Sequence, residues 1–185
     1  MFASNVVGRV TSGDGAIRVL GIDPGLTRCG FAVLDGRGPG AAVAVSLGVI
    51  RTSPADDLPV RLASLRDELV ALLTEFRPHA VAVERVFFQT NVRTAMSVGQ
   101  ASGLALCEAS AAGCEVAQYT PNEVKGAIAG YGAADKAQVA RMVQARLKLT
   151  QLPKPADAAD AAAIALCHLA MAPMRRRVAA AGVGR

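Results

Sequence analysis

The amino-acid sequence predicts an α/β domain built on a mixed five-stranded sheet flanked by helices. Three strand-like segments, 17–23, 29–34 and 42–51, come first with short Pro/Gly-containing turns between them, which is typical of an antiparallel meander. A leucine-rich segment, 58–76, follows, and its apolar residues recur every three or four positions, as in an amphipathic helix. Strand-like and helix-like segments then alternate, which predicts a sheet with a parallel part.

The second half of the chain supplies the remaining elements. The apolar run 80–84 and the segment 114–119 read as strands, and a helix rich in small residues is predicted between them, over 94–112. Thr120 and Glu123 form the pattern of a helix N-cap, with a proline between them at the first helical position. The helix that they begin should stop at Gly130, and two further helices are predicted over 134–149 and 156–171.

Domain organisation follows from composition. Residues 1–16 are small, polar and Gly-rich and are predicted to be a flexible leader. A single domain should cover 17–172, with its last helix ended by Pro173. Residues 173–185 are predicted to be a basic flexible tail.

Charge and hydropathy narrow the class of protein. With 52% hydrophobic and 19% charged residues the composition is globular, and the net charge of +5 favours a polyanionic partner. The four cysteines show no metal-finger spacing, and no signal peptide is evident, so we expect reduced thiols and a cytoplasmic protein. The longest apolar run, 161–172, is too short to span a bilayer and is interrupted by His168, whose position predicts a packing residue.

Four carboxylates stand at the ends of otherwise apolar elements. Asp23 and Glu84 each end a predicted strand, and if those strands are parallel neighbours the two acids lie at the same end of the sheet. Asp157 and Asp160 are three positions apart on a helix and therefore share a face. If that face covers the sheet end, all four acids converge.

Such a cluster favours metal chemistry. Close carboxylates repel one another and raise each other's pKa unless a cation is present. Oxygen-only ligands favour Mg²⁺ or Mn²⁺ over zinc, and two such ions about 4 Å apart can hydrolyse a phosphodiester.

Each acid also has a simpler interpretation. Asp157 could cap its helix, Asp160 could be a surface acid, and Asp23 could begin a turn. Glu84 is the hardest to explain in this way, because pairing with Arg85 would not account for its position at the end of an apolar strand. The combination of four acids favours the metal site.

Three acidic blocks closely resemble the RuvC-type Holliday junction resolvases. The blocks are Gly21-Ile22-Asp23-Pro24-Gly25, Val83-Glu84-Arg85-Val86-Phe87 and Pro155-Ala156-Asp157-Ala158-Ala159-Asp160-Ala161. Segments 99–103, 120–125 and 134–139 fit the same family in the same order. The resemblance extends over about 18–171.

The resemblance implies an RNase H-like (retroviral-integrase-like) fold and a structure-selective endodeoxyribonuclease of recombination and repair. It implies a homodimer that nicks opposing strands of a four-way junction in the bacterial cytosol, with a branch-migration motor complex as a further partner. Asp23, Glu84, Asp157 and Asp160 would be the catalytic metal ligands for Mg²⁺, with Mn²⁺ able to substitute and two ions per site. Some family members carry histidine where this chain has Asp157.

The resemblance also implies DNA contacts. Phe87 would stack on an unpaired base, and core packing is the alternative. Lys125 and Lys136 match phosphate-contacting positions but could be solvated helix charges. The polar residues Gln89, Asn91 and Arg93 suit backbone or groove contacts, and an ordinary loop is the alternative. The helix over 94–112 would contribute to the dimer interface, or else pack on its own sheet.

Three further functions are compatible with the sequence. The Asp23-Pro24-Gly25 turn also resembles one lobe of the actin-like and sugar-kinase ATPases, although the chain has the length for one lobe and those proteins need two. The same residues would suit an inactive nucleic-acid-binding module with a degenerate metal site. An RNase H-type nuclease that cuts RNA–DNA hybrids is the third possibility.

Overall fold

The computed structural model describes residues 16–38, 40–85 and 92–182. Nearly all of the predicted leader, residues 1–15, therefore lies outside the described residues. Within the described ranges no helix is both long enough and apolar enough to cross a membrane.

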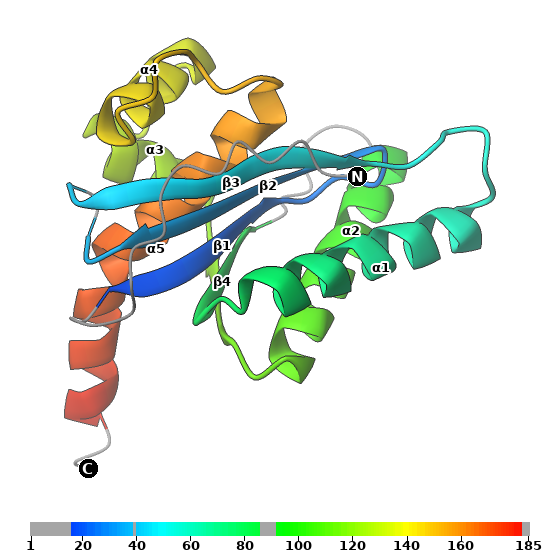
Figure 1. Ribbon diagram of the computed structural model, residues 1–185, viewed down its shortest axis with the longest axis horizontal. Helices are drawn as coiled ribbons and strands as arrows, with labels where there is room; N and C mark the ends of the chain where they lie inside the picture. Colours follow the sequence, from blue (N-terminus) through cyan, green and yellow to red (C-terminus); the bar gives the residue numbers. More distant parts are fainter. Residues whose placement is uncertain (1–15, 39, 86–91, 183–185) are drawn as a thin grey trace.

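The predicted sheet is confirmed. It has five strands in the order β3-β2-β1-β4-β5 (Figure 1). β1 pairs antiparallel with β2 and β2 with β3, whereas β1 with β4 and β4 with β5 are parallel. The strands are β1 Ile17–Asp23, β2 Arg28–Gly36, β3 Ala42–Arg51, β4 Ala80–Glu84 and β5 Glu115–Tyr119.

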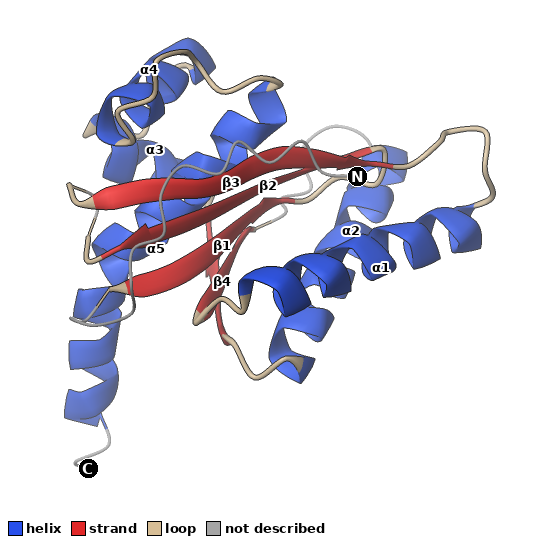
Figure 2. Cartoon of the chain, in the orientation of Figure 1, coloured by secondary structure: helices blue, strands red, loops and turns tan. Residues whose placement is uncertain are grey.

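Helices cover both faces of the sheet (Figure 2). The long helix α5 lies on one face with α3 and α4, while α1 and α2 cover the other. Each face buries its own apolar cluster. The helices are α1 Leu58–Phe76, α2 Val92–Ala111, α3 Pro121–Ala129, α4 Lys136–Arg146 and α5 Ala156–Gly182.

Two glycines bring α5 into direct contact with the sheet. A Cβ atom on Gly21 of β1 would lie 2.2 Å from the carbonyl oxygen of Ala161, and one on Gly30 of β2 would lie 2.2 Å from that of Asp157. The facing part of α5 is built largely of alanine, so helix and strands approach backbone to backbone. This contact fixes the first turns of α5 beside the end of β1.

The predicted start of α4 is two residues too early. Asp135 is the N-cap: its Oδ1 accepts from the Gln138 amide at 2.7 Å, and Gln138 Oε1 accepts from the Asp135 amide at 2.9 Å. The predicted cap of α3 is confirmed, because Thr120 and Glu123 exchange the same pair of hydrogen bonds.

The predicted end of the last helix at Pro173 is wrong. Proline removes one backbone hydrogen bond, but α5 continues through it to Gly182. The continuation is tied to the domain, since the Arg175 guanidinium lies 5.4 Å from the centre of the Tyr119 ring. The hydroxyl of Tyr119 in turn lies 3.0 Å from Nδ1 of buried His168. Residues 173–182 are thus helical, and flexibility of this basic segment stays a prediction.

We predict that Gly21→Ala destabilises the protein by about 1–3 kcal/mol, because the new methyl group has no room between β1 and α5. The measurement is thermal or urea unfolding. Gly126→Ala is the matched control, since nothing lies within 4 Å of its added Cβ and alanine favours the α3 helix. Equal stability of Gly21→Ala and wild type would contradict the proposed backbone contact.

Candidate active site

Two acids lie at the same end and on the same face of the sheet. β1 and β4 run parallel, with Ile22 opposite Val83, so Asp23 and Glu84 are the next residues on adjacent strands. Side chains alternate along a strand, and Gly21 faces α5, so Asp23 also faces α5. Ala82 belongs to the α5-side cluster, which places Glu84 on that face too. The predicted meeting of the two acids is confirmed.

Asp23 and Glu84 line a hollow of about 230 Å³, and residues of α3, α4 and α5 form the rest of its wall. Its polar lining consists of Asp23, Glu84, Asp160, Lys125 and Lys136. Its apolar lining consists of Pro121, Val124, Val139, Ala163 and Ile164. The hollow therefore combines three carboxylates and two cations with an apolar wall.

The clustered carboxylates of the hollow would be stabilised by a nearby positive charge. Burial, followed by the nearby carboxylates of Glu84 and Asp160, raises the pKa of Asp23 to about 8. Burial also raises the pKa of Glu84. With a pKa of about 8, Asp23 holds a proton near neutral pH when no cation is bound. A cation would replace that proton.

Lys136 supplies part of the positive charge. Its Nζ donates to Asp160 Oδ2 at 3.1 Å, and the proximity of Asp160 raises the pKa of the lysine. The lysine side chain is 85% exposed, whereas that of Asp160 is 24% exposed. Lys136 can therefore swing toward solvent without unfolding anything.

The fourth predicted acid is placed differently. Asp157 is not among the described residues that line the hollow. It stands in the first turn of α5, and its Oδ2 accepts hydrogen bonds from Nε of Arg28, at 2.9 Å, and from Nη2 of the same side chain. Arg28 is the first residue of β2 and was missed by the sequence reasoning. The sequence pattern that could have indicated it is the two-residue spacing of Arg28 and Gly30 on one strand, which places both on the face that α5 covers.

The acids are the ligand type that a hard divalent cation prefers. In the described side-chain arrangement, however, they do not all point toward one common position. Within the described ranges, no three His, Cys, Asp or Glu side chains are positioned together to hold a metal ion. Asp160 is turned to Lys136 and Asp157 to Arg28. The donor set consists of oxygens alone, and burial together with the neighbouring carboxylates raises the pKa of Asp23, so the residues fit Mg²⁺ or Mn²⁺.

The predicted DNA-contacting residues divide into three groups. Lys125 and Lys136 both line the hollow. Phe87, Gln89 and Asn91 lie outside the described residues. Arg93 falls in the first turn of α2 and not in a loop, a correction to its predicted setting.

A hollow of about 290 Å³ near the other end of β1 has a structural explanation. Arg18 donates from Nε and Nη2 to the two oxygens of Asp35, both at 2.7 Å, and from Nη1 to the Phe76 carbonyl at 3.0 Å. These bonds tie β1 to β2 and to the end of α1. Because Arg18 and Asp35 neutralise each other's charge, we do not assign this hollow a catalytic role.

An acid-lined hollow at the ends of two parallel strands, on this sheet topology, is the arrangement expected of the RNase H-like class of nucleases. A sequence profile of the family described as crossover junction endodeoxyribonuclease RuvC matches residues 19–168. The crossover junction endodeoxyribonuclease RuvC of Salinispora arenicola is 53% identical over 165 residues, which are 89% of this chain and 94% of that protein. The chain belongs to the RuvC family of crossover junction endodeoxyribonucleases.

Solved structures agree with this assignment. The structure of Thermus thermophilus RuvC in complex with a Holliday junction substrate superposes with a TM-score of 0.82 at 41% identity, covering 86% of this chain and 96% of that one. The yeast mitochondrial Holliday junction resolvase has a TM-score of 0.62 at 16% identity, over 83% of this chain and 78% of its own. The second likeness supports the fold alone.

We predict that the free energy of unfolding of the metal-free wild type falls as pH rises from about 4 to about 8. Asp23→Asn should lack the part of this fall that comes from ionisation of Asp23. The unfolded chain ionises Asp23 near pH 4, whereas the folded chain keeps the proton until about pH 8, so raising the pH favours unfolding in that window. At pH 8 the variant should therefore be the more stable protein, and at pH 4 the difference should vanish.

The measurement is thermal unfolding against pH in EDTA. Asp56→Asn, which alters an exposed acid in the loop before α1, is the control and should follow wild type. Parallel pH profiles for wild type and Asp23→Asn would show that Asp23 ionises normally in the folded protein.

Proposed function

We propose that this chain resolves four-way DNA junctions by paired symmetric nicks, with its acidic hollow as the site of metal-dependent phosphodiester hydrolysis. The single observation that carries the proposal is the meeting of Asp23, Glu84 and Asp160 in a partly buried hollow where the pKa of Asp23 is raised. Family membership supports the reaction. The Holliday junction bound to the Thermus relative supports the substrate.

We assign Asp23, Glu84, Asp160 and Asp157 as the metal ligands. A bound pair of Mg²⁺ or Mn²⁺ ions would activate water and stabilise the leaving oxygen. Asp23 and Glu84 are held by the ends of two central strands and need little rearrangement. Asp160 and Asp157 stand on the rigid first turns of α5 and must exchange their basic partners for the cations.

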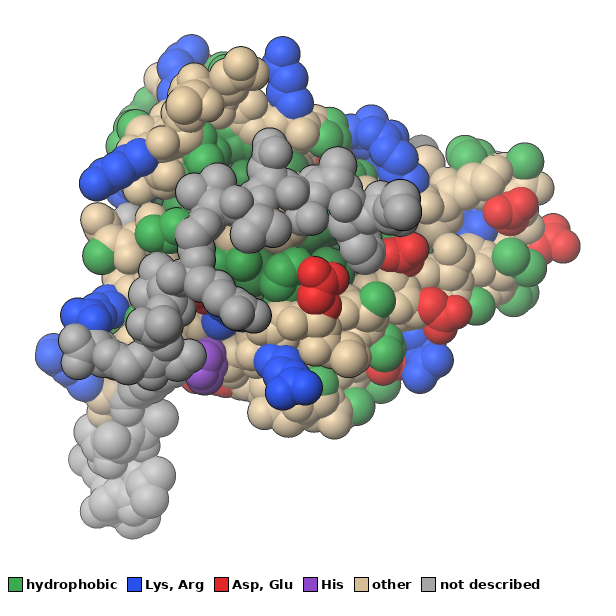
Figure 3. All heavy atoms as spheres, in the orientation of Figure 1, with side chains coloured by type: hydrophobic (Ala, Val, Ile, Leu, Met, Phe, Trp, Pro, Cys, Tyr) green, Lys and Arg blue, Asp and Glu red, His purple; other side chains and the backbone are tan. Residues whose placement is uncertain are grey.

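The chain's own cations attract and orient the DNA. Lys125 and Lys136 stand at the mouth of the acidic hollow and would hold the phosphates on either side of the reacting one. Figure 3 shows Lys and Arg side chains over α4, while acidic side chains gather over the start of α1. The basic side chains over α4 and the two lysines at the hollow favour an approach of DNA from the α3–α4 side. The remaining proposed contacts are Phe87, Gln89, Asn91 and Arg93.

We further propose a homodimer that acts in the bacterial cytosol together with a branch-migration motor. A four-way junction has four strands, and paired symmetric nicks fall on two opposing strands, which the two active sites of a dimer can cut together. The helix α2 supports a role in pairing: Met96 is 60% exposed, and added Cβ atoms at Gly99 and Gly103 would meet nothing within 4 Å. Small residues of this kind let a second backbone come close.

The deciding experiment is cleavage of a labelled mobile four-way junction, with and without Mg²⁺ or Mn²⁺, beside linear duplex and an RNA–DNA hybrid. Paired symmetric nicks on the junction alone, dependent on metal, are expected. Junction binding without cleavage would indicate an inactive binding module. Preferred cleavage of the hybrid would indicate a different RNase H-type nuclease, and both results would contradict the proposal.

We predict that Asp160→Asn lowers cleavage at least about 100-fold, because even the partners of metal ligands contribute 10- to 100-fold. Junction affinity should stay close to that of wild type, since binding rests on phosphate contacts and shape. Gel-shift titration and single-turnover cleavage measure the two effects separately. Asp56→Asn serves as the control at an exposed acid. Cleavage at wild-type rate by Asp160→Asn would refute the assignment of this ligand.

A further inference from the structure

The ion pair between Arg28 and Asp157 joins a residue with no assigned role to a proposed metal ligand. Both Nε and Nη2 of Arg28 donate to the same oxygen, Oδ2 of Asp157. The pair links the first residue of β2 to the first turn of α5, across 129 positions of sequence. The side chains are 42% and 26% exposed, so the pair stands at the rim of the site.

The backbone of Asp157 lies directly against β2. Its carbonyl oxygen lies 2.2 Å from the place that a Cβ on Gly30 would occupy, so the helix cannot move closer to the strand. Rotation of the Asp157 side chain is the simplest way for its carboxylate to change partner. In the described arrangement it points to Arg28, while Asp160, one turn further on, reaches the hollow.

We propose that Arg28 is a built-in counter-ion that competes with a divalent cation for Asp157 and so sets the cation concentration at which the site fills. The proposal rests on the assignment of Asp157 as a metal ligand made above. A carboxylate paired with a guanidinium must give up charge-assisted hydrogen bonds before it can bind a metal ion fully. The fixed positive charge of Arg28 also repels a cation close to Asp157.

Lys136 holds Asp160 in a comparable way, but Arg28 is the cleaner residue to test. Lys136 is also a proposed phosphate contact at the hollow, so its removal would change two properties at once. Arg28 is not among the described residues that line the hollow. An ion pair of this exposure contributes little to folding, so its loss should leave the fold intact.

The experiment measures Mg²⁺ binding to the full-length protein without DNA, by calorimetric titration and by the Mg²⁺-dependent rise in Tm. Arg28→Gln should bind Mg²⁺ about two- to five-fold more tightly than wild type, the range expected for a partly exposed pair. Arg28→Lys keeps the charge and should stay near wild type. In the Asp157→Asn background, Arg28→Gln should have a smaller effect, because only the repulsion between Arg28 and the cation is then removed, and the difference measures the competition for Asp157.

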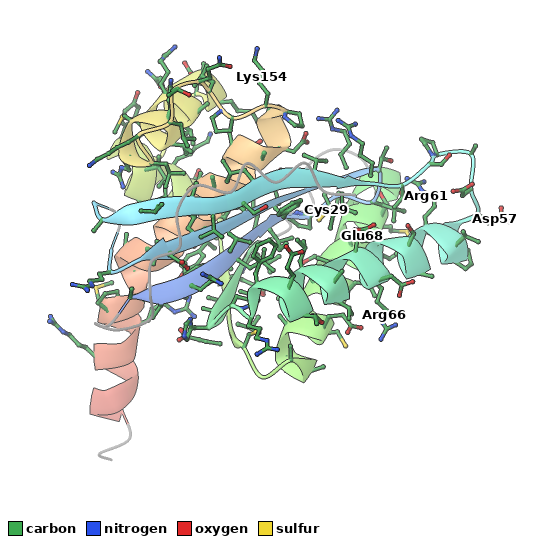
Figure 4. The ribbon with its side chains drawn as sticks, viewed as in Figure 1. Cys29, Asp57, Arg61, Arg66, Glu68 and Lys154 are labelled. Atoms are coloured by element: carbon green, nitrogen blue, oxygen red, sulfur yellow. The ribbon has the colours of Figure 1, made fainter. Side chains whose placement is uncertain are left out.

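Arg66→Gln is the matched control. Arg66 makes an ion pair of the same kind, with Nε 2.7 Å from Glu108 Oε1, but it stands on α1, on the opposite face of the sheet from α5 (Figure 4). Its Mg²⁺ affinity should equal that of wild type. Activity plays no part in this measurement.

Three outcomes would overturn the proposal. Unchanged affinity of Arg28→Gln would make the pair a surface salt bridge without effect on the site. Weaker affinity would mean that Arg28 orients Asp157 as a ligand instead of competing for it. A wild-type protein that binds no divalent cation would overturn the proposed metal site itself. This outcome is distinguished from the first two because the titration of wild type alone reveals it.

Discussion

The site depends above all on the direct contact between α5 and the two glycines of β1 and β2. Gly21 and Gly30 leave no space for a side chain, so the alanine-rich helix lies on the strand backbones themselves. Any larger residue would lift the helix and carry Asp160 away from Asp23. The convergence of the acids is thus a consequence of packing: β1 and β4 bring two acids together, and the close approach of α5 adds a third.

Bringing these acids together costs electrostatic energy, and the described side chains show how the protein offsets it. Asp23, whose pKa is raised to about 8, keeps a proton near neutral pH, and Asp160 and Asp157 take Lys136 and Arg28 as partners. Each of these compensations is reversible. A proton can leave, and partly exposed basic side chains can turn away, whereas a site closed by apolar packing would not be accessible to metal and DNA.

Much of this could be predicted from the sequence because it depends on local patterns. Strand ends, the cap at Thr120 and the leucine periodicity of α1 depend on neighbouring residues. The parallel pairing of β1 and β4 was one arrangement that the order of elements allowed, and the structure shows it. The Arg28–Asp157 pair could not be predicted, since it joins residues far apart in sequence through side-chain rotation. Continuation of α5 past Pro173 was also missed, because the Arg175–Tyr119 contact that anchors it is a tertiary one.

The most direct test of the central claim is the anomalous diffraction signal of Mn²⁺ in crystals of the wild-type protein. The claim is that the acids at the ends of β1, β4 and the start of α5 form one cation site. Anomalous peaks bonded to carboxylate oxygens of Asp23 and Glu84, with Asp160 or Asp157 completing the coordination, are predicted. Mn²⁺ bound elsewhere at saturating metal, with no peak at Asp23 and Glu84, would contradict the account.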